Sequence, residues 1–317
     1  MIIIYGPTGV GKTDFAEMLA SRIPAEIVNA DLGQFYTPLT VGTAKPNWRN
    51  SPIPQHHFDI INEPSLISVS QYRDYVKQTL EGIWTRKNIP ILVGGSGFYI
   101  QSLFFPPSSG AGPNLTSKHA GDVTDRWNQL YTIDPVRALK IHPNDLYRIN
   151  RALDIFYSTG QKPSDCPPSY QPITSFYFVY LTRDRDDLYE RINMRTHTMI
   201  THGWIEEVQR LKDTSWESFL KIKKIIGYDD ILYYLEGEKT DNNLTNLFET
   251  IAQKTRNYAK RQITFGNQLL GQLEKQIIKN QDTVSKCVQF NLTSSNLELY
   301  INQLLEVFNR DMKIGEQ

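Results

Sequence analysis

The 317-residue chain has few features that would tie it to a membrane, an oxidising compartment or polyanions in general. Its two cysteines, Cys166 and Cys287, are too few and too far apart for a disulfide framework or a four-cysteine zinc site. Lys plus Arg and Asp plus Glu both number 34, so there is no net charge to attract nucleic acid or lipid. No apolar run reaches the length of a membrane span. We therefore expect a cytoplasmic protein without a membrane partner, whose nucleic-acid contacts, if any, come from local basic surfaces.

The most informative stretch is GPTGVGKT, from Gly6 to Thr13. It has the spacing of a phosphate-binding loop and lies between an apolar β-branched run, IIIY, and a stretch with helical periodicity, KTDFAEMLASRI. In such a loop backbone N–H groups converge on phosphate oxygens, Lys12 neutralises the outer phosphate, and the Thr13 hydroxyl binds Mg²⁺. A nucleoside triphosphate and another organic diphosphate fit this loop equally well. The predicted phosphate site consists of Gly6, Pro7, Thr8, Gly9, Val10, Gly11, Lys12 and Thr13.

Apolar runs alternate with stretches of helical periodicity, which is typical of an α/β protein with a parallel sheet flanked by helices. The runs AEIVNAD and IPILVGGSG predict further strands. Prolines and glycines crowd together at residues 104–114, residues 115–160 are polar and helical, and the α/β pattern resumes with SFYFVYL. We therefore expect a first part of the core at residues 1–107, a helical insertion at 108–172, and a second part of the core with C-terminal helices at 173–317.

The second part of the core contains two further helix signals. The stretch RDDLYERINMRTHTMITHG predicts a helix that ends at Gly203, because glycine commonly follows the last helical residue. Residues 244–265 predict a long amphipathic helix. Near the end, CVQFNL and NLELYINQLLEVF predict a last strand and helix.

Two of the expected strands end in polar groups. Asp31 closes AEIVNAD, and Ser96 follows IPILV. Ligands bind at the carboxyl ends of parallel strands, so both side chains are candidates for a site. Asp31 could support the metal, act as a base toward a second substrate, or only cap the following turn, and the residue types leave these roles open.

Several segments together resemble one family, the tRNA dimethylallyltransferases, also called tRNA isopentenyltransferases, in their bacterial form. The resemblance runs in order from about residue 2 to residue 265. It implies a P-loop NTPase-like sheet with a smaller all-helical insertion. It also implies transfer of the dimethylallyl group from dimethylallyl diphosphate to the N6 amine of the adenosine 3′-adjacent to the anticodon, tRNA position 37, with release of diphosphate. The segments that carry it are GPTGVGKT, NADLGQFY, VGTAKP, QHHFDI, VGGSGFYI, HPNDLYRINRALDIF, IIGYDDILYYLEGE and AKRQITF.

The resemblance implies roles for particular residues. Asp31 would be the general base toward the amine, Ser96 would orient the amine, and Arg195, with Arg191 as the alternative, would contact the diphosphate. Mg²⁺ would be held by Thr13. Contacts to the anticodon stem-loop of tRNA are expected from Asp31, Leu32, Gly33, Gln34, Ser96, Tyr147, Arg148, Ile149, Asn150, Arg151, Lys254, Arg256, Lys260 and Arg261.

The chain departs from the family pattern at two places. Leu32 and Gly33 replace the common serine and arginine, and Phe265 and Gly266 replace tryptophan and phenylalanine, so some polar RNA contacts are missing. A small-molecule or nucleoside kinase and a non-catalytic P-loop RNA-binding protein are the alternatives, and the basic stretches could be only solvated helix surface. The expected partners are tRNA and dimethylallyl diphosphate, and we expect a monomer.

Overall fold

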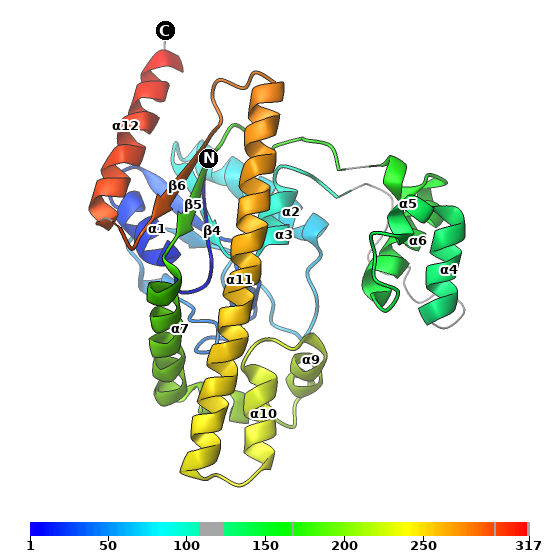
Figure 1. Ribbon diagram of the computed structural model, residues 1–317. Coiled ribbons are helices and arrows are strands. Elements are labelled where there is room, and N and C mark those ends of the chain that lie inside the picture. The colour runs from blue at the N-terminus through cyan, green and yellow to red at the C-terminus, as the bar shows by residue number, and fades with distance from the viewer. Residues whose placement is uncertain (108–122, 167, 295, 316–317) are drawn as a thin grey trace. The chain divides into compact units, whose positions relative to one another are not determined.

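The computed structural model describes residues 1–107, 123–166, 168–294 and 296–315 (Figure 1). The chain forms two compact units. We call them the core unit, Met1–Ile67, Asp74–Gln101 and Ile173–Gln317, and the helical unit, Ser68–Arg73 and Ser102–Pro172. The predicted first residue of the insertion, Ser108, lies outside the described residues, so that boundary stays a prediction.

The core unit is built on one six-stranded sheet whose paired strands are all parallel, in the order β3-β2-β4-β1-β5-β6. The central strand β1 is fully buried, and Ile3 pairs with Leu92 on one side and Phe178 on the other. Near-continuous apolar strands of this kind suit a parallel sheet that is covered on both faces. The predicted α/β class with a parallel sheet is confirmed. The strands are β1 Ile2–Tyr5, β2 Ala25–Asn29, β3 Gln55–His56, β4 Ile89–Gly94, β5 Tyr177–Thr182 and β6 Lys286–Asn291.

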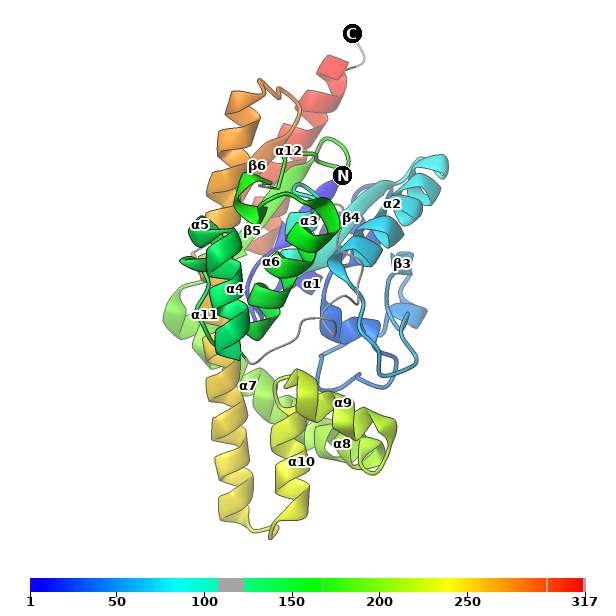
Figure 2. The ribbon, with the colours of Figure 1, turned by 90° about the vertical axis from the view of Figure 1, so that its right-hand side faces the viewer.

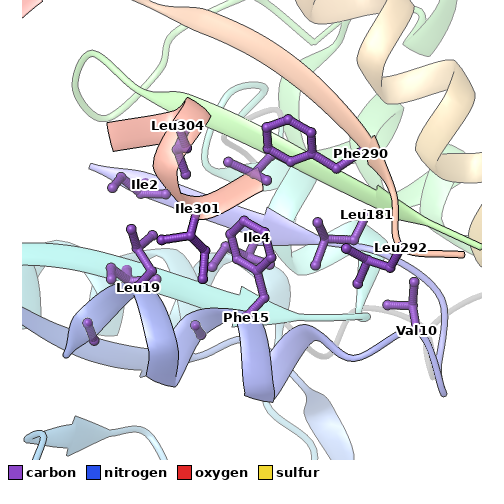
Figure 3. Close-up of a cluster of buried hydrophobic side chains, with 14 of the residues drawn as sticks. Ile2, Ile4, Val10, Phe15, Leu19, Leu181, Phe290, Leu292, Ile301 and Leu304 are labelled. Carbon is purple, nitrogen blue, oxygen red and sulfur yellow. The ribbon is translucent and has the colours of Figure 1, made fainter. Parts of the chain in front are cut away.

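Two helices from opposite ends of the chain share one apolar cluster with the sheet (Figure 3). Helix α1, Lys12–Ala20, contributes Phe15 and Leu19, and α12, Leu297–Gly315, contributes Ile301 and Leu304. The ring of Phe15 stacks on that of Phe290 from β6 at 6.1 Å. The helix that begins in the phosphate loop is thereby held by the last strand and helix of the chain.

The remaining helices include the two that the sequence predicted before residue 203 and over residues 244–265. In the core unit they are α7 Arg185–Met199, α8 Ile205–Leu211, α9 Ser215–Lys223, α10 Tyr228–Glu236 and α11 Asp241–Lys279, while α2 Val69–Thr85 and α3 Gly97–Ser102 contain residues of both units.

The helix predicted to stop before Gly203 does end there, and a second helix follows it closely. Helix α7 ends at Met199, and within the following turn, Ile200–Trp204, the backbone of His202 and Gly203 is not helical; Gly203 has a φ of 101°, the left-handed conformation that glycine tolerates. The next residue, Trp204, is 2% exposed, and its ring lies 5.7 Å from that of Tyr228 in α10. Burial of Trp204 keeps the chain compact past the glycine, so α8 begins at once.

Helix α11 continues the predicted 244–265 stretch to Lys279 and lies alongside α7 and α10 (Figure 1). Two buried tyrosines of the sheet donate to its backbone: Tyr5 to the carbonyl of Gln262 at 2.9 Å and Tyr180 to that of Ile263 at 3.2 Å. A Cβ at Gly266 would lie 2.7 Å from the Tyr180 ring. The glycine at this departure from the family pattern therefore lets the helix reach the sheet.

The helical unit contains α4 Val123–Ile133, α5 Pro135–Ala138 and α6 Leu146–Thr159 (Figure 2). Its core includes Leu130, Ala138, Ile149 and Leu153, which are fully buried. Asp134, also buried, accepts bonds from the backbone N–H groups of Arg137 and Ser164 and so caps α5. The described part of the insertion is helical, as predicted.

Candidate active site

The phosphate loop lies between β1 and α1, and its lysine is folded into it. The Nζ atom of Lys12 donates to the carbonyls of Gly6 at 3.0 Å and Pro7 at 2.9 Å. Gly9 and Gly11 have φ angles of 83° and 104°, which residues with a Cβ rarely adopt. Burial lowers the pKa of Lys12 to about 8, Arg195 adds to this effect, and the carboxylate of Asp31 opposes it. A bound anion would favour the charged form of Lys12, as the carboxylate of Asp31 does.

Three arginines hold the loop from the side of β5 and α7. Arg195 donates from Nη2 to Oγ1 of Thr8 at 2.7 Å, and Arg191 donates from Nε to the carbonyl of Gly9 at 2.9 Å. Arg183, just after β5, donates from Nε to the carbonyl of Val10 at 2.9 Å. Both arginines predicted on α7 therefore reach the loop. Of the three arginines, only Arg195 is exposed, and it contacts a side chain of the loop, whereas Arg183 and Arg191 contact backbone carbonyls.

Asp31 caps a single 3₁₀ turn, Leu32–Phe35, directly after β2. Its Oδ1 accepts from the N–H of Gly33 at 3.3 Å, and its own N–H donates to Oδ1 of Asn29 at 3.0 Å. The capping role considered from the sequence is therefore present, and among the described contacts it uses Oδ1. A carboxylate has two oxygens, so the cap leaves room for a second role.

Ser96 follows β4 and is joined to the Asp31 turn. Its Oγ accepts from the N–H of Leu32 at 2.9 Å. A Cβ at Gly33 would lie 2.9 Å from Cγ2 of Thr43, so the glycine at this departure from the family pattern sits in a crowded position. The hydroxyl of Ser96 can still donate a hydrogen bond, since the contact with Leu32 uses only an acceptor site.

The sheet order brings these groups to one edge of the core unit. Strands β2, β4, β1 and β5 are neighbours, and the Asp31 turn, Ser96, the phosphate loop and α7 all follow their carboxyl ends. The carboxylate of Asp31 interacts electrostatically with Lys12 and Arg195. Cations that can bind diphosphate and a carboxylate that can accept a proton therefore share one edge.

Two residues of α11 at this edge were not singled out from the sequence. Burial, reinforced by Asp31, raises the pKa of the Tyr258 phenol above its ordinary value. Gln262 is 4% exposed, and its side chain contacts both the phosphate loop and the turn before Ser96. The helical periodicity predicts that the segment AKRQITF and the tyrosine just before it lie on one helix. It does not indicate which other segments their side chains contact.

Buried charges hold the loop that follows the Asp31 turn. Glu207 of α8, 3% exposed, accepts from the N–H groups of Thr40 at 2.8 Å and Val41 at 2.6 Å. Lys45 pairs with Asp59 at 2.5 Å. These contacts join the segments VGTAKP and QHHFDI, whose function the sequence alone did not indicate.

Both histidines of the QHHFDI segment contact other side chains of the protein. His56 pairs with the buried Glu26 at 2.6 Å, and the Nε2 atom of His57 lies 2.7 Å from Oγ1 of Thr79. Burial, with the neighbouring His56, lowers the pKa of His57 to about 4. Within the part of the chain that the structure describes, no three His, Cys, Asp or Glu side chains are arranged to hold a metal ion.

The RNA-contact candidates of α11 differ in how they are engaged. Lys254 pairs with Asp230 of α10 at 2.5 Å, and Arg256 donates to Oδ1 of Asn193 at 2.6 Å. Lys260 and Arg261 are exposed, and the Arg261 guanidinium lies 5.7 Å from the centre of the Tyr258 ring. Lys254 is exposed as well but paired, so Lys260 and Arg261 are the exposed members of this set for which no ion pair is seen among the described residues.

The candidates in the helical unit lie at the start of α6. Tyr147 is 77% exposed, and Arg148, also exposed, pairs with Asp145. Ile149 is fully buried in the unit's core, and Asn150 is 8% exposed. Arg151 is half-buried. The side chains of Tyr147 and Arg148 are thus the most accessible of these candidates.

Comparison with known proteins places the chain in a family. Residues 34–268 match the family model described as IPP transferase, and residues 1–52 match that of isopentenyl transferase. The tRNA dimethylallyltransferase of Alkaliphilus oremlandii is 37% identical over 276 residues, which cover 84% of this chain and 87% of the relative. In the described residues no helix is both long and apolar enough to cross a membrane.

Solved structures agree with the predicted fold class. The tRNA isopentenylpyrophosphate transferase of Bacillus halodurans has a TM-score of 0.64 at 27% identity, covering 100% of this chain and 99% of that one. A eukaryotic dimethylallyltransferase acting on tRNA has a TM-score of 0.73 at 27% identity, covering 93% of this chain and 75% of that one. The resemblance read from the sequence motifs is confirmed: the chain belongs to the IPP transferase family, the family of the tRNA dimethylallyltransferases.

Proposed function

We propose that this chain transfers the dimethylallyl group of dimethylallyl diphosphate to the N6 amine of adenosine 37 in tRNA and releases diphosphate. The observation that carries the proposal is the shared edge of the sheet, where a phosphate loop with Lys12 and Arg195 faces the carboxylate of Asp31. In a member of this family, the phosphate loop and its cations would form the diphosphate half of the site, which binds the leaving group. The Asp31 carboxylate would form the nucleophile half, which activates the amine.

The diphosphate half has to stabilise the negative charge that grows as the carbon–oxygen bond breaks. Loop N–H groups at the start of α1, the ammonium of Lys12 and the guanidinium of Arg195 supply positive charge there. Diphosphate leaves as a whole, so a nucleoside triphosphate is not hydrolysed. This is why a kinase-type phosphate loop can serve a prenyl transfer.

The residues at the loop fit Mg²⁺ as a companion of the diphosphate. Thr13 is exposed in the first turn of α1, where its hydroxyl can be one ligand. Mg²⁺ usually takes few protein ligands and completes its shell with water and substrate phosphates, so an acidic cluster is not required. When bound, the ion would neutralise charge on the departing diphosphate.

The nucleophile half has to remove a proton from a weakly basic amine. The nitrogen of the adenine amine forms a bond to C1 of the dimethylallyl group, the bond from C1 to the diphosphate oxygen breaks, and the amine proton passes to the Asp31 carboxylate. The hydroxyl of Ser96 can donate a hydrogen bond to the adenine and so orient its amine. The target adenosine has to leave its stack to reach this edge.

The tRNA would be held by exposed basic and aromatic side chains. We propose Lys260 and Arg261 on α11 and Tyr147 and Arg148 on α6 as the main contacts of the anticodon stem-loop, because these side chains are exposed.

The proposal is tested by a transfer assay with competing acceptors. The purified chain is incubated with Mg²⁺, radiolabelled dimethylallyl diphosphate and an unmodified anticodon stem-loop that carries adenosine at position 37, with AMP and ATP present. We expect label in the RNA, and none in a matched stem-loop with guanosine at position 37. Label in AMP or ATP, or phosphate transfer from ATP, would instead indicate a nucleotide prenyltransferase or a kinase.

A further inference from the structure

A single buried amide, that of Gln262, bridges two loops of the candidate active site. Its Oε1 accepts from the N–H of Thr8 at 2.8 Å, and its Nε2 donates to the carbonyl of Gly95 at 2.8 Å. The residue is 4% exposed. The Thr8 N–H can bind only the oxygen of the amide, and the Gly95 carbonyl can bind only its nitrogen. The two contacts therefore set the orientation of the Gln262 amide.

The backbone of α11 is held against the sheet at Gln262 and the next residue. Tyr5 donates to the backbone carbonyl of Gln262 at 2.9 Å, and Tyr180 donates to that of Ile263 at 3.2 Å. The absence of a Cβ at Gly266 permits this approach, and a Cβ at Gly95 would lie only 2.3 Å from Nε2 of Gln262. Both the backbone and the side chain of Gln262 are therefore held in place.

The two loops belong to the two halves of the proposed reaction. Thr8 is in the phosphate loop, and its Oγ1 receives the bond from Arg195. Gly95 directly precedes Ser96, whose Oγ receives the N–H of Leu32 next to Asp31. A path of hydrogen bonds thus runs from Arg195 through Thr8 and Gln262 to the turn beside Asp31.

We propose that Gln262 is a positioning residue that sets the spacing between the diphosphate and the nucleophile. This inference rests on the proposed transferase function. Transfer between two bound groups depends steeply on their distance and alignment, so a displacement of about 1 Å costs roughly a hundredfold in rate. The Thr8 N–H is occupied by Gln262, so in this proposal it holds the loop in place and leaves the diphosphate to other N–H groups of the loop.

Two variants separate positioning from packing. In Gln262→Glu the bond from Thr8 remains while the donor to Gly95 is removed. We expect the single-turnover transfer rate at saturating dimethylallyl diphosphate to fall about a hundredfold. The Kd should also rise, because the variant adds a negative charge beside the phosphate loop. In Gln262→Met, which keeps the volume but removes both bonds, we expect the rate to fall and this Kd to rise by about tenfold. Gln268→Glu, on an exposed turn of the same helix, is the matched control and should leave both quantities unchanged.

A purely structural role would give a different pattern. Both variants would then melt at lower temperature while the folded fraction kept the single-turnover transfer rate of the original chain at saturating substrate, and this result would overturn the proposal. A measurement on the unchanged chain does not depend on how the variants fold. The Thr8 amide should exchange its hydrogen slowly without ligand, and exchange at the rate of an open loop would also overturn the proposal.

The transfer assay distinguishes failure of this inference from failure of the proposed function. If the unchanged chain transfers no label to RNA, the function itself is wrong. If it does so and Gln262→Glu matches it in rate, only the positioning role is wrong.

Discussion

The ammonium of Lys45 lies 2.5 Å from Oδ1 of Asp59, and their side chains are only 2% and 8% exposed. Lys45 also donates to the backbone carbonyl of Tyr36 at 2.7 Å, just after the 3₁₀ turn that Asp31 caps. Lys45 therefore joins the end of the turn that follows the proposed base, Asp31, to the segment that contains Asp59. Arg49 supplies a second, exposed partner to the same carboxylate.

Replacing Asp59 by Asn should destabilise the protein. The change leaves the buried ammonium of Lys45 without its counter-charge, and breaking a buried pair in this way costs about 3 kcal/mol or more. Urea unfolding measures the difference. Asp74→Asn, which removes an exposed pair with Lys77, is the control and should change the free energy of unfolding by less than about 0.5 kcal/mol. Equal effects of the two substitutions would contradict the role of the buried pair.

Replacing Asp31 by Asn should remove most of the transfer rate and leave the diphosphate site intact. The amide keeps an oxygen to cap the 3₁₀ turn but cannot accept the amine proton, so kcat should fall by about a hundredfold or more. Affinity for dimethylallyl diphosphate should stay equal or rise slightly, because a negative charge near Lys12 and Arg195 is removed. Rapid-quench transfer and calorimetric binding measure the two quantities. A variant with an unchanged kcat would exclude Asp31 as the base.

The affinity for dimethylallyl diphosphate should fall as pH rises above about 8. The pKa of Lys12 is lowered to about 8 in the absence of ligand, and a bound diphosphate favours the charged form. Below this pH Lys12 already carries its proton, so the Kd is flat; above it, binding must take up a proton, and the Kd rises by up to about tenfold per pH unit. Calorimetry between about pH 7 and about pH 9.5 tests this. In Lys12→Ala the affinity should be weaker throughout, and a remaining slope of the same size would assign the titration to another group.

The exposed and paired cations of α11 should differ in their effect on tRNA binding. Removing the charges of Lys260 and Arg261 should weaken binding and reduce the slope of log K against log salt by about 0.7 to 0.9 for each phosphate that the variant no longer neutralises. Lys254→Gln should do less, because Lys254 already pairs with Asp230 at 2.5 Å. Filter binding at several salt concentrations distinguishes the two. An equal weakening for both would show that the Lys254 pair opens when RNA binds.

Part of the candidate site was accessible from the sequence, and part was not. The loop spacing predicted the residues around Lys12 because that motif is local, and the resemblance pointed to Asp31, Ser96 and Arg195. No local pattern indicated that Gln262 reaches two loops, since its partners are 254 and 167 residues away in the chain. For the same reason the basic stretch of α11 did not reveal that Asp230 lies beside Lys254.

The sequence by itself determined the phosphate loop, the parallel α/β pattern and the family, because each depends on the order and spacing of residues along the chain and not on which distant segments meet. Only the tertiary structure decided that Thr8, Gln262 and Gly95 form one bridge, that Lys45 and Asp59 are buried together, and that another helix, α8, follows directly after the kink at Gly203. Those outcomes depend on which strands become neighbours and on which side chains are shielded from water, and both are set by packing between segments far apart in the chain.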